Sequence, residues 1–323
     1  MISGREQPVS LRISVTDRCQ LRCIYCMPAD GVPLVPRGDV LSFEEIIRFV
    51  RAARKAFGVR KVHLTGGEPL ARPGIIDLVA MLAAEDVEDL ALTTNGQVLA
   101  ACARHLRNAG LGRVNVSLDT LDPTKYAALT RCGRVERTIE GIEAALAEGL
   151  GAVKINTLVL RGHNDHEVPR LAAWAMGRGC EIRFLELMPI GPAAADFKKL
   201  FVSKDEVISR LSRSYDLRPL ESSDRCTGQR FEASDRSGAS GMIGVIPSTS
   251  EPFCSSCRRL RLTSTGTLIG CLRLGTGVDV SRLLRSGAAA DEGRLAACME
   301  EALAGKSAGE EFVTSTGMNR TGG

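Results

Sequence analysis

Three cysteines near the beginning of the chain have a spacing that suits an iron–sulfur cluster. Cys19, Cys23 and Cys26 form a C-x3-C-x2-C run directly after the apolar stretch Leu11–Val15. Cysteine thiolates hold such clusters, and a complete set of protein ligands for a [4Fe–4S] cluster has four members. Three ligands therefore predict a cluster with one iron open to a substrate or cofactor. Zinc is the alternative, but its sites usually need a second ligand pair, and the nearest histidine is His63.

A second set of three cysteines lies in the last quarter of the chain. Cys254, Cys257 and Cys271 follow the spacing C-x2-C-x13-C. A structural zinc site with Cys226 as its fourth ligand fits this spacing, and so does a second [4Fe–4S] cluster with an open iron.

The residues after Cys257 bear on this choice. Arg259 and Arg261 would point from the same face of a strand, because side chains two positions apart share a face. Arginine suits bidentate recognition of phosphate and carboxylate groups. The sequence thus favours a cluster beside an anionic ligand over a zinc ribbon.

Composition restricts the class of protein. The chain has 323 residues, of which 44% are hydrophobic, enough for one large α/β domain with an appendage or for two domains. Eleven cysteines without a visible export signal indicate a reducing cytoplasmic location and metal or redox chemistry rather than disulfides. No uninterrupted apolar run reaches membrane-spanning length, so we expect no membrane partner. The net charge of +4 is too mild to suggest a nucleic-acid partner.

Short apolar runs alternate with segments of helical periodicity in the first 190 residues. Such alternation predicts a parallel sheet with right-handed crossovers, either an open doubly wound sheet or a barrel. The expected strands are Leu11–Val15, Lys61–Thr65, Asp89–Thr93, Arg113–Ser117, Val153–Leu160 and Glu181–Glu186. The expected helices are Phe43–Phe57, Gly74–Glu85, Val98–Ala109, Val135–Glu148 and Glu167–Arg178.

One face of these strands is polar and the other is apolar. Arg12, His63, Asn115 and Lys154 alternate with aliphatic residues in four different strands. A sheet covered by helices on both faces is apolar on both. A curved sheet with a polar concavity explains the pattern better, and its ligands would bind at the carboxyl ends of the strands.

The pattern changes after Pro189. Residues Ile190–Asp196 are rich in Gly, Pro and Ala and read as a linker, so we expect a core over 1–190 and a second region over 191–323. The second region is expected to contain a helix, an aperiodic polar stretch, a hairpin and two short helices: Lys204–Leu211, Ser222–Ser240, Arg258–Thr263 with Thr267–Cys271, Ser281–Arg285 and Arg294–Leu303. Gly305-Lys306-Ser307 suggests a phosphate loop, but the required preceding glycine is replaced by Glu300.

The first cysteine loop resembles a known signature. The run Thr16–Met27, with Tyr25 before the third cysteine, resembles the loop of the radical S-adenosylmethionine (SAM) enzymes. In that superfamily the open iron binds the amino and carboxylate groups of SAM, and an electron from the cluster cleaves SAM to a 5′-deoxyadenosyl radical.

The whole chain from Leu11 to Gly323 is similar to one family of that superfamily, the GTP 3′,8-cyclases of molybdenum cofactor biosynthesis. A second three-cysteine set, paired arginines and a final Gly-Gly occur together in few radical SAM families. The segments that carry the likeness are Thr16–Met27, Gly66–Leu70, Thr93–Gly96, Val116–Asp119, Lys154–Asn156, Arg183–Pro189, the second cysteine set and Gly322-Gly323.

This resemblance implies a fold and two cofactor types. The fold would be a partial (β/α)6 barrel of the TIM type, with a C-terminal extension that carries a second cluster. Each cysteine set would hold one [4Fe–4S] cluster. The SAM-binding residues would be Tyr25, Gly67, Ser117 and Met188.

The resemblance also implies the reaction. The radical would abstract the 3′ hydrogen of GTP, and the sugar radical would attack C8 of guanine, giving (8S)-3′,8-cyclo-7,8-dihydroguanosine 5′-triphosphate. The second cluster would contact guanine through its open iron. Residues assigned to GTP are Arg12, Lys61, His63, Thr94, Lys154, Arg183, Arg259, Leu260 and Arg261. Residues assigned to catalysis are Cys19, Cys23, Cys26, Arg259, Arg261, Gly322 and Gly323.

The family likeness implies partners as well: GTP, a reduced donor of the flavodoxin or ferredoxin type, a downstream cyclic pyranopterin monophosphate synthase, and a second copy in a homodimer.

The chain departs from the family pattern at four places. His63 stands where Arg is usual, Arg258 and Gln20 stand where Asn is usual, and Met318–Thr321 differs from the usual run before the final glycines. His63 removes a permanent positive charge from the proposed phosphate side.

Two other functions remain open at this point. One is a radical SAM enzyme that modifies a peptide or another nucleotide and uses an auxiliary cluster. Such enzymes often carry more C-terminal cysteines, and a peptide substrate needs no arginines for a triphosphate. The other is a non-catalytic iron–sulfur electron-transfer protein, which would need no large polar cavity.

Overall fold

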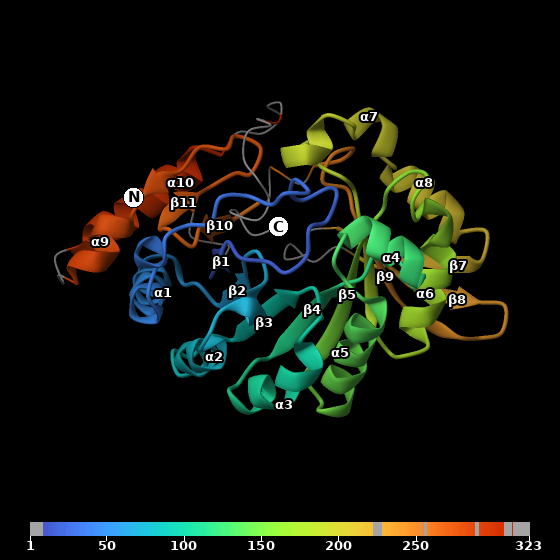
Figure 1. Cartoon of the computed structure of the whole chain (residues 1–323), viewed down its shortest axis with the longest axis horizontal. Helices are drawn as coiled ribbons and strands as arrows, with labels where there is room; N and C mark the ends of the chain where they lie inside the picture. The colour runs from blue at the N-terminus through green and yellow to red at the C-terminus, as the bar shows by residue number, and fades with distance from the viewer. Residues whose placement is uncertain are drawn as a thin grey trace.

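The structure is a computed structural model, and it describes residues 9–221, 228–252, 254, 257–287, 291–306 and 312. The described residues form a curved sheet of 12 strands in the order β12-β11-β10-β1-β2-β3-β4-β5-β6-β9-β8-β7. Figure 1 shows the sheet bent into an arc, with helices along its outer side and the concave side left to loops. The sheet does not close on itself, so the expected partial barrel is confirmed.

Six parallel strands in chain order form the middle of this sheet. Each is hydrogen-bonded to the next, from β1 to β6. Their bounds are β1 Ser10–Ser14, β2 Lys61–Thr65, β3 Asp89–Thr94, β4 Arg113–Ser117, β5 Ala152–Leu158 and β6 Glu181–Leu185. The sequence therefore located all six, with ends that differ by at most two residues.

Helices cover the convex face and connect the parallel strands (Figure 1). They are α1 Phe43–Phe57, α2 Ile75–Ala83, α3 Leu99–Asn108, α4 Pro123–Thr130, α5 Val135–Ala147 and α6 Val168–Met176. The sequence of α1 shows why it starts and stops where it does. Ser42 and Glu45 form a reciprocal capping box, and Gly58 ends the helix in a left-handed conformation. Helix α4 is absent from the expected elements, because its eight residues lack a strong apolar period.

The later part of the chain extends both edges of the same sheet. Strand β9, Ser240–Ile246, pairs in parallel with β6, and β10, Arg259–Leu262, pairs in parallel with β1. The remaining strands are β7 Tyr215–Pro219, β8 Gln229–Asp235, β11 Thr267–Ile269 and β12 Val278–Asp279. The remaining helices are α7 Phe197–Leu200, α8 Lys204–Leu211, α9 Ser281–Ser286 and α10 Asp291–Ala304.

One expectation about this region was wrong. Ser222–Ser240 is predicted as aperiodic, but its described part contains β8 and the start of β9. The two strands pair with each other, and β9 pairs with β6, so tertiary contacts supply the order that the residue pattern does not show. The division at residue 190 stays a prediction, and the sheet hydrogen bonds run across it.

The sheet register places the polar side chains together on the concave face. Arg12 on β1 is paired with His63 on β2 and with Arg261 on β10. Asn115 on β4 is paired with Lys154 on β5. The alternate residues, such as Leu11, Val62 and Leu260, are buried in the core between the sheet and its helices. No helix in the part of the chain that the structure describes is long and apolar enough to cross a membrane.

Candidate active site

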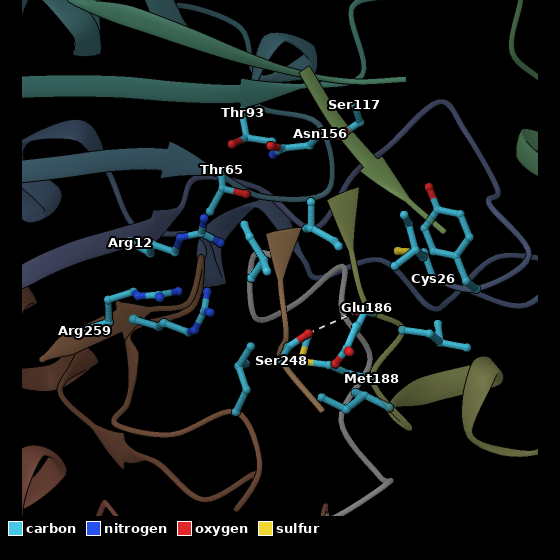
Figure 2. A pocket seen from close by; sticks show the side chains of 18 of the residues that line it. Arg12, Cys26, Thr65, Thr93, Ser117, Asn156, Glu186, Met188, Ser248 and Arg259 are labelled. Atoms are coloured by element: carbon cyan, nitrogen blue, oxygen red, sulfur yellow. Dashed lines mark hydrogen bonds between the residues drawn. The ribbon is translucent and has the colours of Figure 1, made fainter. Parts of the chain in front are cut away.

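A cavity at the carboxyl ends of the parallel strands is lined by both cysteine sets (Figure 2). The loops after β1, β2, β3 and β6 contribute to it. We call it the cysteine cavity. Its lining includes Cys19, Cys23, Cys26, Cys254, Cys257 and Cys271. More than 220 positions separate Cys26 from Cys254, so only the folded sheet brings the sets together.

Two glycines allow the first cysteine loop to approach β2. A Cβ on Gly67 would lie 2.3 Å from the carbonyl oxygen of Arg18, and one on Gly66 would lie 2.6 Å from that of Thr16. The amide of Gly67 donates to Thr16 O at 2.7 Å, and the amide of Glu68 donates to Arg18 O at the same distance. Gly67 therefore has a structural role in holding the cysteine loop, in addition to its predicted role beside SAM.

Glu68 connects this glycine pair to the loop after β3. The carboxylate is 1% exposed and accepts hydrogen bonds from Thr94 Oγ1 at 2.7 Å and from the amide of Asn95 at 2.7 Å. Burial outweighs these hydrogen bonds and raises the pKa of Glu68 to about 7. Thr94, predicted to contact GTP, lines the cysteine cavity but uses its hydroxyl to hold Glu68.

Tyr25, Ser117 and Met188, predicted to bind SAM, also line the cysteine cavity. The hydroxyl of Tyr25 donates to Asp119 at 2.6 Å, and Asp119 also accepts from the amide of Leu158. Burial raises the pKa of Asp119 to about 6, against both hydrogen bonds.

Figure 2 shows Cys26 and Arg259 on opposite sides of the cavity. Asn156 lines the cavity, and its Oδ1 is buried with no hydrogen-bond partner in the described residues. An unpartnered buried acceptor is costly, so Oδ1 of Asn156 is suited to accept a hydrogen bond from a ligand.

The thiols of the first set are suited to a cofactor that binds thiolates. Burial raises the pKa of Cys19 to about 11 and of Cys26 to about 12, and the neighbouring thiol of the set adds to the shift of Cys26. The pKa of Cys23 is raised well above its usual value by burial and then by Cys26. Among the described residues, no three ligating side chains already converge on one metal position, so the cysteines share the cavity without forming a closed metal site. Thiols that resist ionisation need a positively charged partner to become ligands, and the irons of a cluster provide it. The donor set therefore fits an iron–sulfur cluster.

The second cysteine set lies in a more positively charged environment than the first. Burial opposes ionisation of Cys257, but the charges of Lys306 and Arg259 outweigh it and lower the pKa. Lys306 Nζ lies 3.4 Å from Cys257 Sγ. A lowered thiol pKa favours the thiolate that a cluster iron requires. Cys254, Cys257 and Cys271 line the same cavity, and three thiols are the ligand type that a cluster uses.

A second cavity adjoins the first at the amino ends of the strands. We call it the basic cavity, and it shares Arg12, Arg183 and Arg259 with the cysteine cavity. Its other ionisable lining residues are Lys61, His63, Asp89, Arg113, Lys154, Glu181 and Arg230. The polar concavity inferred from the strand pattern thus extends through the barrel from one end to the other.

Two carboxylates, Asp89 and Glu181, each bind more than one cation of the basic cavity. Asp89 binds Arg113 at 2.7 Å and Lys61 at 3.6 Å. Glu181 binds Lys154 at 2.8 Å and Arg230 at 3.3 Å. Among the described residues that line the basic cavity, cations outnumber these two carboxylates.

The remaining positive charge is expensive to bury. Burial and then the charges of Arg261, Arg259 and Arg183 hold the pKa of Arg12 well below its usual value. Burial and the nearby arginines likewise lower the pKa of His63 well below its usual value, so the imidazole is neutral. His63 Nε2 is within 2.6 Å of Thr93 Oγ1 and 3.2 Å of Asn115 Nδ2. Positive charges gathered in one cavity indicate a site for a polyanion.

Most of the predicted site residues lie in these two cavities, and one does not. Leu260 is 0% exposed and packs in the hydrophobic core, because it alternates with Arg259 and Arg261 along β10. Its side chain cannot contact GTP, so the expected contact is corrected to one that only the main chain could make. Gly322 and Gly323 lie outside the described residues.

Several lining residues had no assigned role from the sequence. Arg230 lies in the stretch that shows no period, and Lys306 belongs to the dismissed phosphate-loop motif. Glu68 and Asp119 are part of segments that carry the family likeness, which was their only signal. The residues missed are Glu68, Asp119, Arg113, Asn156, Arg230 and Lys306.

Two family models match consecutive parts of the chain, and each part contributes one of the cysteine sets. The family model of the Radical SAM superfamily matches residues 13–175, and that of Molybdenum Cofactor Synthesis C matches residues 180–312. The GTP 3′,8-cyclase of Geobacter sulfurreducens is 45% identical over 85% of this chain and 84% of its own. The GTP 3′,8-cyclase of Rhodopseudomonas palustris strain TIE-1 is 42% identical over 96% of this chain and 89% of its own.

Solved structures support the fold alone. SuiB of Streptococcus suis bound to S-adenosylmethionine aligns with 86% of this chain at a TM-score of 0.61 and 16% identity. The chain spans 65% of the length of SuiB. Methylornithine synthase aligns with 65% of this chain, and 63% of its own, at a TM-score of 0.51 and 20% identity.

Proposed function

Because the chain belongs to the GTP 3′,8-cyclase family of the radical SAM superfamily, whose members use SAM and iron–sulfur clusters, we propose that it cyclises GTP to (8S)-3′,8-cyclo-7,8-dihydroguanosine 5′-triphosphate. This is the first step of molybdenum cofactor biosynthesis. Two relatives that are 45% identical to this chain are GTP 3′,8-cyclases, which argues against the two alternatives, a peptide-modifying enzyme and a non-catalytic electron carrier.

The observation that carries the proposal is the cation-rich floor beneath the cysteine cavity. Arg12, Arg183 and Arg259 line both cavities, and burial, followed by the charges of neighbouring arginines, lowers the pKa of Arg12. A triphosphate carries about four negative charges near neutral pH and would relieve that repulsion. GTP bound there would extend its nucleoside toward the cysteines at the other end of the barrel.

At the carboxyl ends of the strands, the first cysteine set is proposed to hold the cluster that binds SAM. Tyr25, Ser117 and Met188 would line SAM, and the unpartnered Oδ1 of Asn156 is available to a polar group of a ligand. When bound, SAM on this cluster supplies the radical that removes the 3′ hydrogen of the ribose. The protein contributes orientation and the exclusion of water around that step.

The second cysteine set is proposed to hold the cluster that contacts guanine. Arg261 is 8% exposed and lines the same cavity as Cys254 and Cys271. Arg259 and Arg261 alternate with Leu260, so both guanidinium groups face the cavity while the leucine fixes the strand in the core. Lys61, Lys154 and His63 would face the phosphates from the basic cavity. The Gly322-Gly323 tail is proposed to enter the cysteine cavity.

The finer predictions on partners and location belong to this proposal. A reduced flavodoxin or ferredoxin type donor would supply the electron, and a cyclic pyranopterin monophosphate synthase would consume the product. A homodimer and a cytoplasmic location are proposed as well, the latter because the cysteines need a reducing environment.

The test is anaerobic reconstitution with iron, sulfide, SAM and a reductant, with and without GTP. Mass analysis should find 5′-deoxyadenosine and a cyclised guanosine triphosphate only in the complete mixture. ATP in place of GTP is the matched control and should give no cyclised product. Formation of 5′-deoxyadenosine without any GTP-dependent product would contradict the proposal.

A further inference from the structure

Lys306 is a half-buried cation beside the second cysteine set that no assigned role explains. Its ammonium group donates to the carbonyl oxygens of Cys257 at 2.9 Å and Arg259 at 2.7 Å. The same group lies 3.4 Å from Cys257 Sγ, within hydrogen-bond distance of a sulfur acceptor. Two carbonyl oxygens thus fix the charge where it faces the sulfur, and the side chain lines the cysteine cavity.

The main chain around Lys306 is built to bring it there. Lys306 follows the end of α10, and α10 packs against β10 and β11. A Cβ on Gly270 would lie 1.8 Å from the carbonyl oxygen of Ala302, so only glycine beside Cys271 permits this close approach. The last turn of α10 is therefore docked on the strand pair that carries Cys257 and Cys271.

The first cysteine set has no equivalent contact among the described residues. Cys19 Sγ accepts from the amide of Leu21 at 3.4 Å and from Asn95 Nδ2 at 3.7 Å, and both donors are neutral. The two sets thus differ in the charge of the group that donates to a ligating sulfur.

We propose that Lys306 is a positioning residue of the second cluster, which holds the Cys257 sulfur by a charge-assisted hydrogen bond and raises the reduction potential of that cluster. This inference rests on the proposed assignment of Cys254, Cys257 and Cys271 as ligands. Reduction adds negative charge to a cluster. A fixed positive charge and a hydrogen bond at a ligating sulfur stabilise the reduced state more than the oxidised state, which makes the potential less negative.

The experiment is a redox titration of the anaerobically reconstituted full chain, followed by electron paramagnetic resonance. Iron is counted first, and about eight irons per chain are expected if both sets hold [4Fe–4S] clusters. Lys306→Met keeps an unbranched side chain that is one atom shorter and removes the charge. At the wild-type midpoint potential, its second cluster should show a roughly tenfold lower ratio of reduced to oxidised form, which is ~59 mV for one electron.

Three further variants make the comparison specific. Lys306→Arg keeps the charge and should stay near the wild-type potential. Lys199→Met removes a lysine that is 82% exposed and should leave both clusters unchanged. Lys306→Gln keeps a neutral donor, and it should lie between the methionine variant and the wild type.

The outcomes separate this inference from the proposed function. About four irons in the wild type would reject the ligand assignment itself. Eight irons with an unchanged second-cluster potential in Lys306→Met would overturn the role of Lys306. Loss of iron from both the methionine and the glutamine variants would overturn it too, since Lys306 would then hold the site together rather than set its potential.

Discussion

The carboxylate of Glu181 accepts a hydrogen bond from the ammonium group of Lys154 at 2.8 Å on the floor of the basic cavity. Glu181 starts β6, and Lys154 lies on the neighbouring β5, where the register pairs the two residues. Glu181 also lies 3.3 Å from Arg230 and 3.9 Å from Arg183, so one carboxylate holds three cations. These are the charges that the proposed triphosphate would meet.

Glu181→Gln should therefore tighten GTP binding and lower the thermal stability of the ligand-free protein. Removing the carboxylate frees Lys154 for the phosphates and also leaves like charges uncompensated. We expect a severalfold lower Kd for GTP by calorimetry and a lower Tm without nucleotide. Lys154→Met is the opposite control, with a Kd roughly tenfold or more higher, as for loss of a charged hydrogen bond. Unchanged or weaker GTP binding in Glu181→Gln would show that Glu181 instead positions Lys154 for the substrate.

Replacement of Cys254, Cys257 and Cys271 by alanine should halve the iron content. Two [4Fe–4S] clusters hold about eight irons, and one set should retain about four. GTP cyclisation should be abolished, while uncoupled cleavage of SAM persists at the first set. Iron analysis and mass analysis of both products check this. Zinc at the second set in protein purified without oxygen would contradict the two-cluster assignment.

His63→Arg should tighten GTP binding, because a permanent bidentate donor replaces a neutral ring. A gain of about 1.5–3 kcal/mol, roughly tenfold or more in Kd, is typical of a charged hydrogen bond. The ligand-free variant should have a lower Tm, because Arg12, Arg113 and Arg183 already surround the position. An unchanged Kd would show that His63 does not face the phosphates.

The pKa of His63 also sets a pH dependence. Because it is lowered in the folded protein, neutral His63 contributes stability above about pH 6.5 that is lost as the pH falls below that value. The wild type should therefore lose stability relative to His63→Gln on acidification through this range, measured by denaturant unfolding. Parallel pH profiles for the two proteins would contradict the burial of His63 among cations.

Glu68 predicts a second pH effect, of opposite sign. Its pKa is raised from 4.5 to about 7, so its stabilising contribution is complete below pH 4.5 and is lost as the pH rises through 7. Relative to Glu68→Gln, the cluster-free wild type should lose up to ~3 kcal/mol of unfolding free energy across this range. Equal slopes for the two proteins would mean that Glu68 is not desolvated.

Deletion of Gly322 and Gly323 should leave the fold and the iron content intact and abolish cyclisation. Only residues without a Cβ pass close to a ligand in a crowded site, so replacement of both by alanine should have the same effect. Tm should change little, because two glycines bury little apolar surface. Full cyclase activity in the truncated protein would show that the tail is only a frayed end.

The sequence by itself determined the chemistry and the order of the elements. Ligand type and spacing are local properties, so Cys19, Cys23 and Cys26 could be assigned to a cluster without any structure. The alternation of Arg12, His63 and Lys154 with aliphatic residues likewise fixed which strand faces are polar, because strand side chains alternate with a period of two.

Only the tertiary structure decided how distant segments combine. Strand β10 lies beside β1, which aligns Arg261 with Arg12 and brings the second cysteine set into the cysteine cavity. No local pattern shows this pairing, because parallel partners are chosen by packing across the whole sheet. The same reason explains why Arg230 and Lys306 escaped notice. Each takes its place from the docking of β8 or α10, and the residues around it in the sequence carry no signal of that contact.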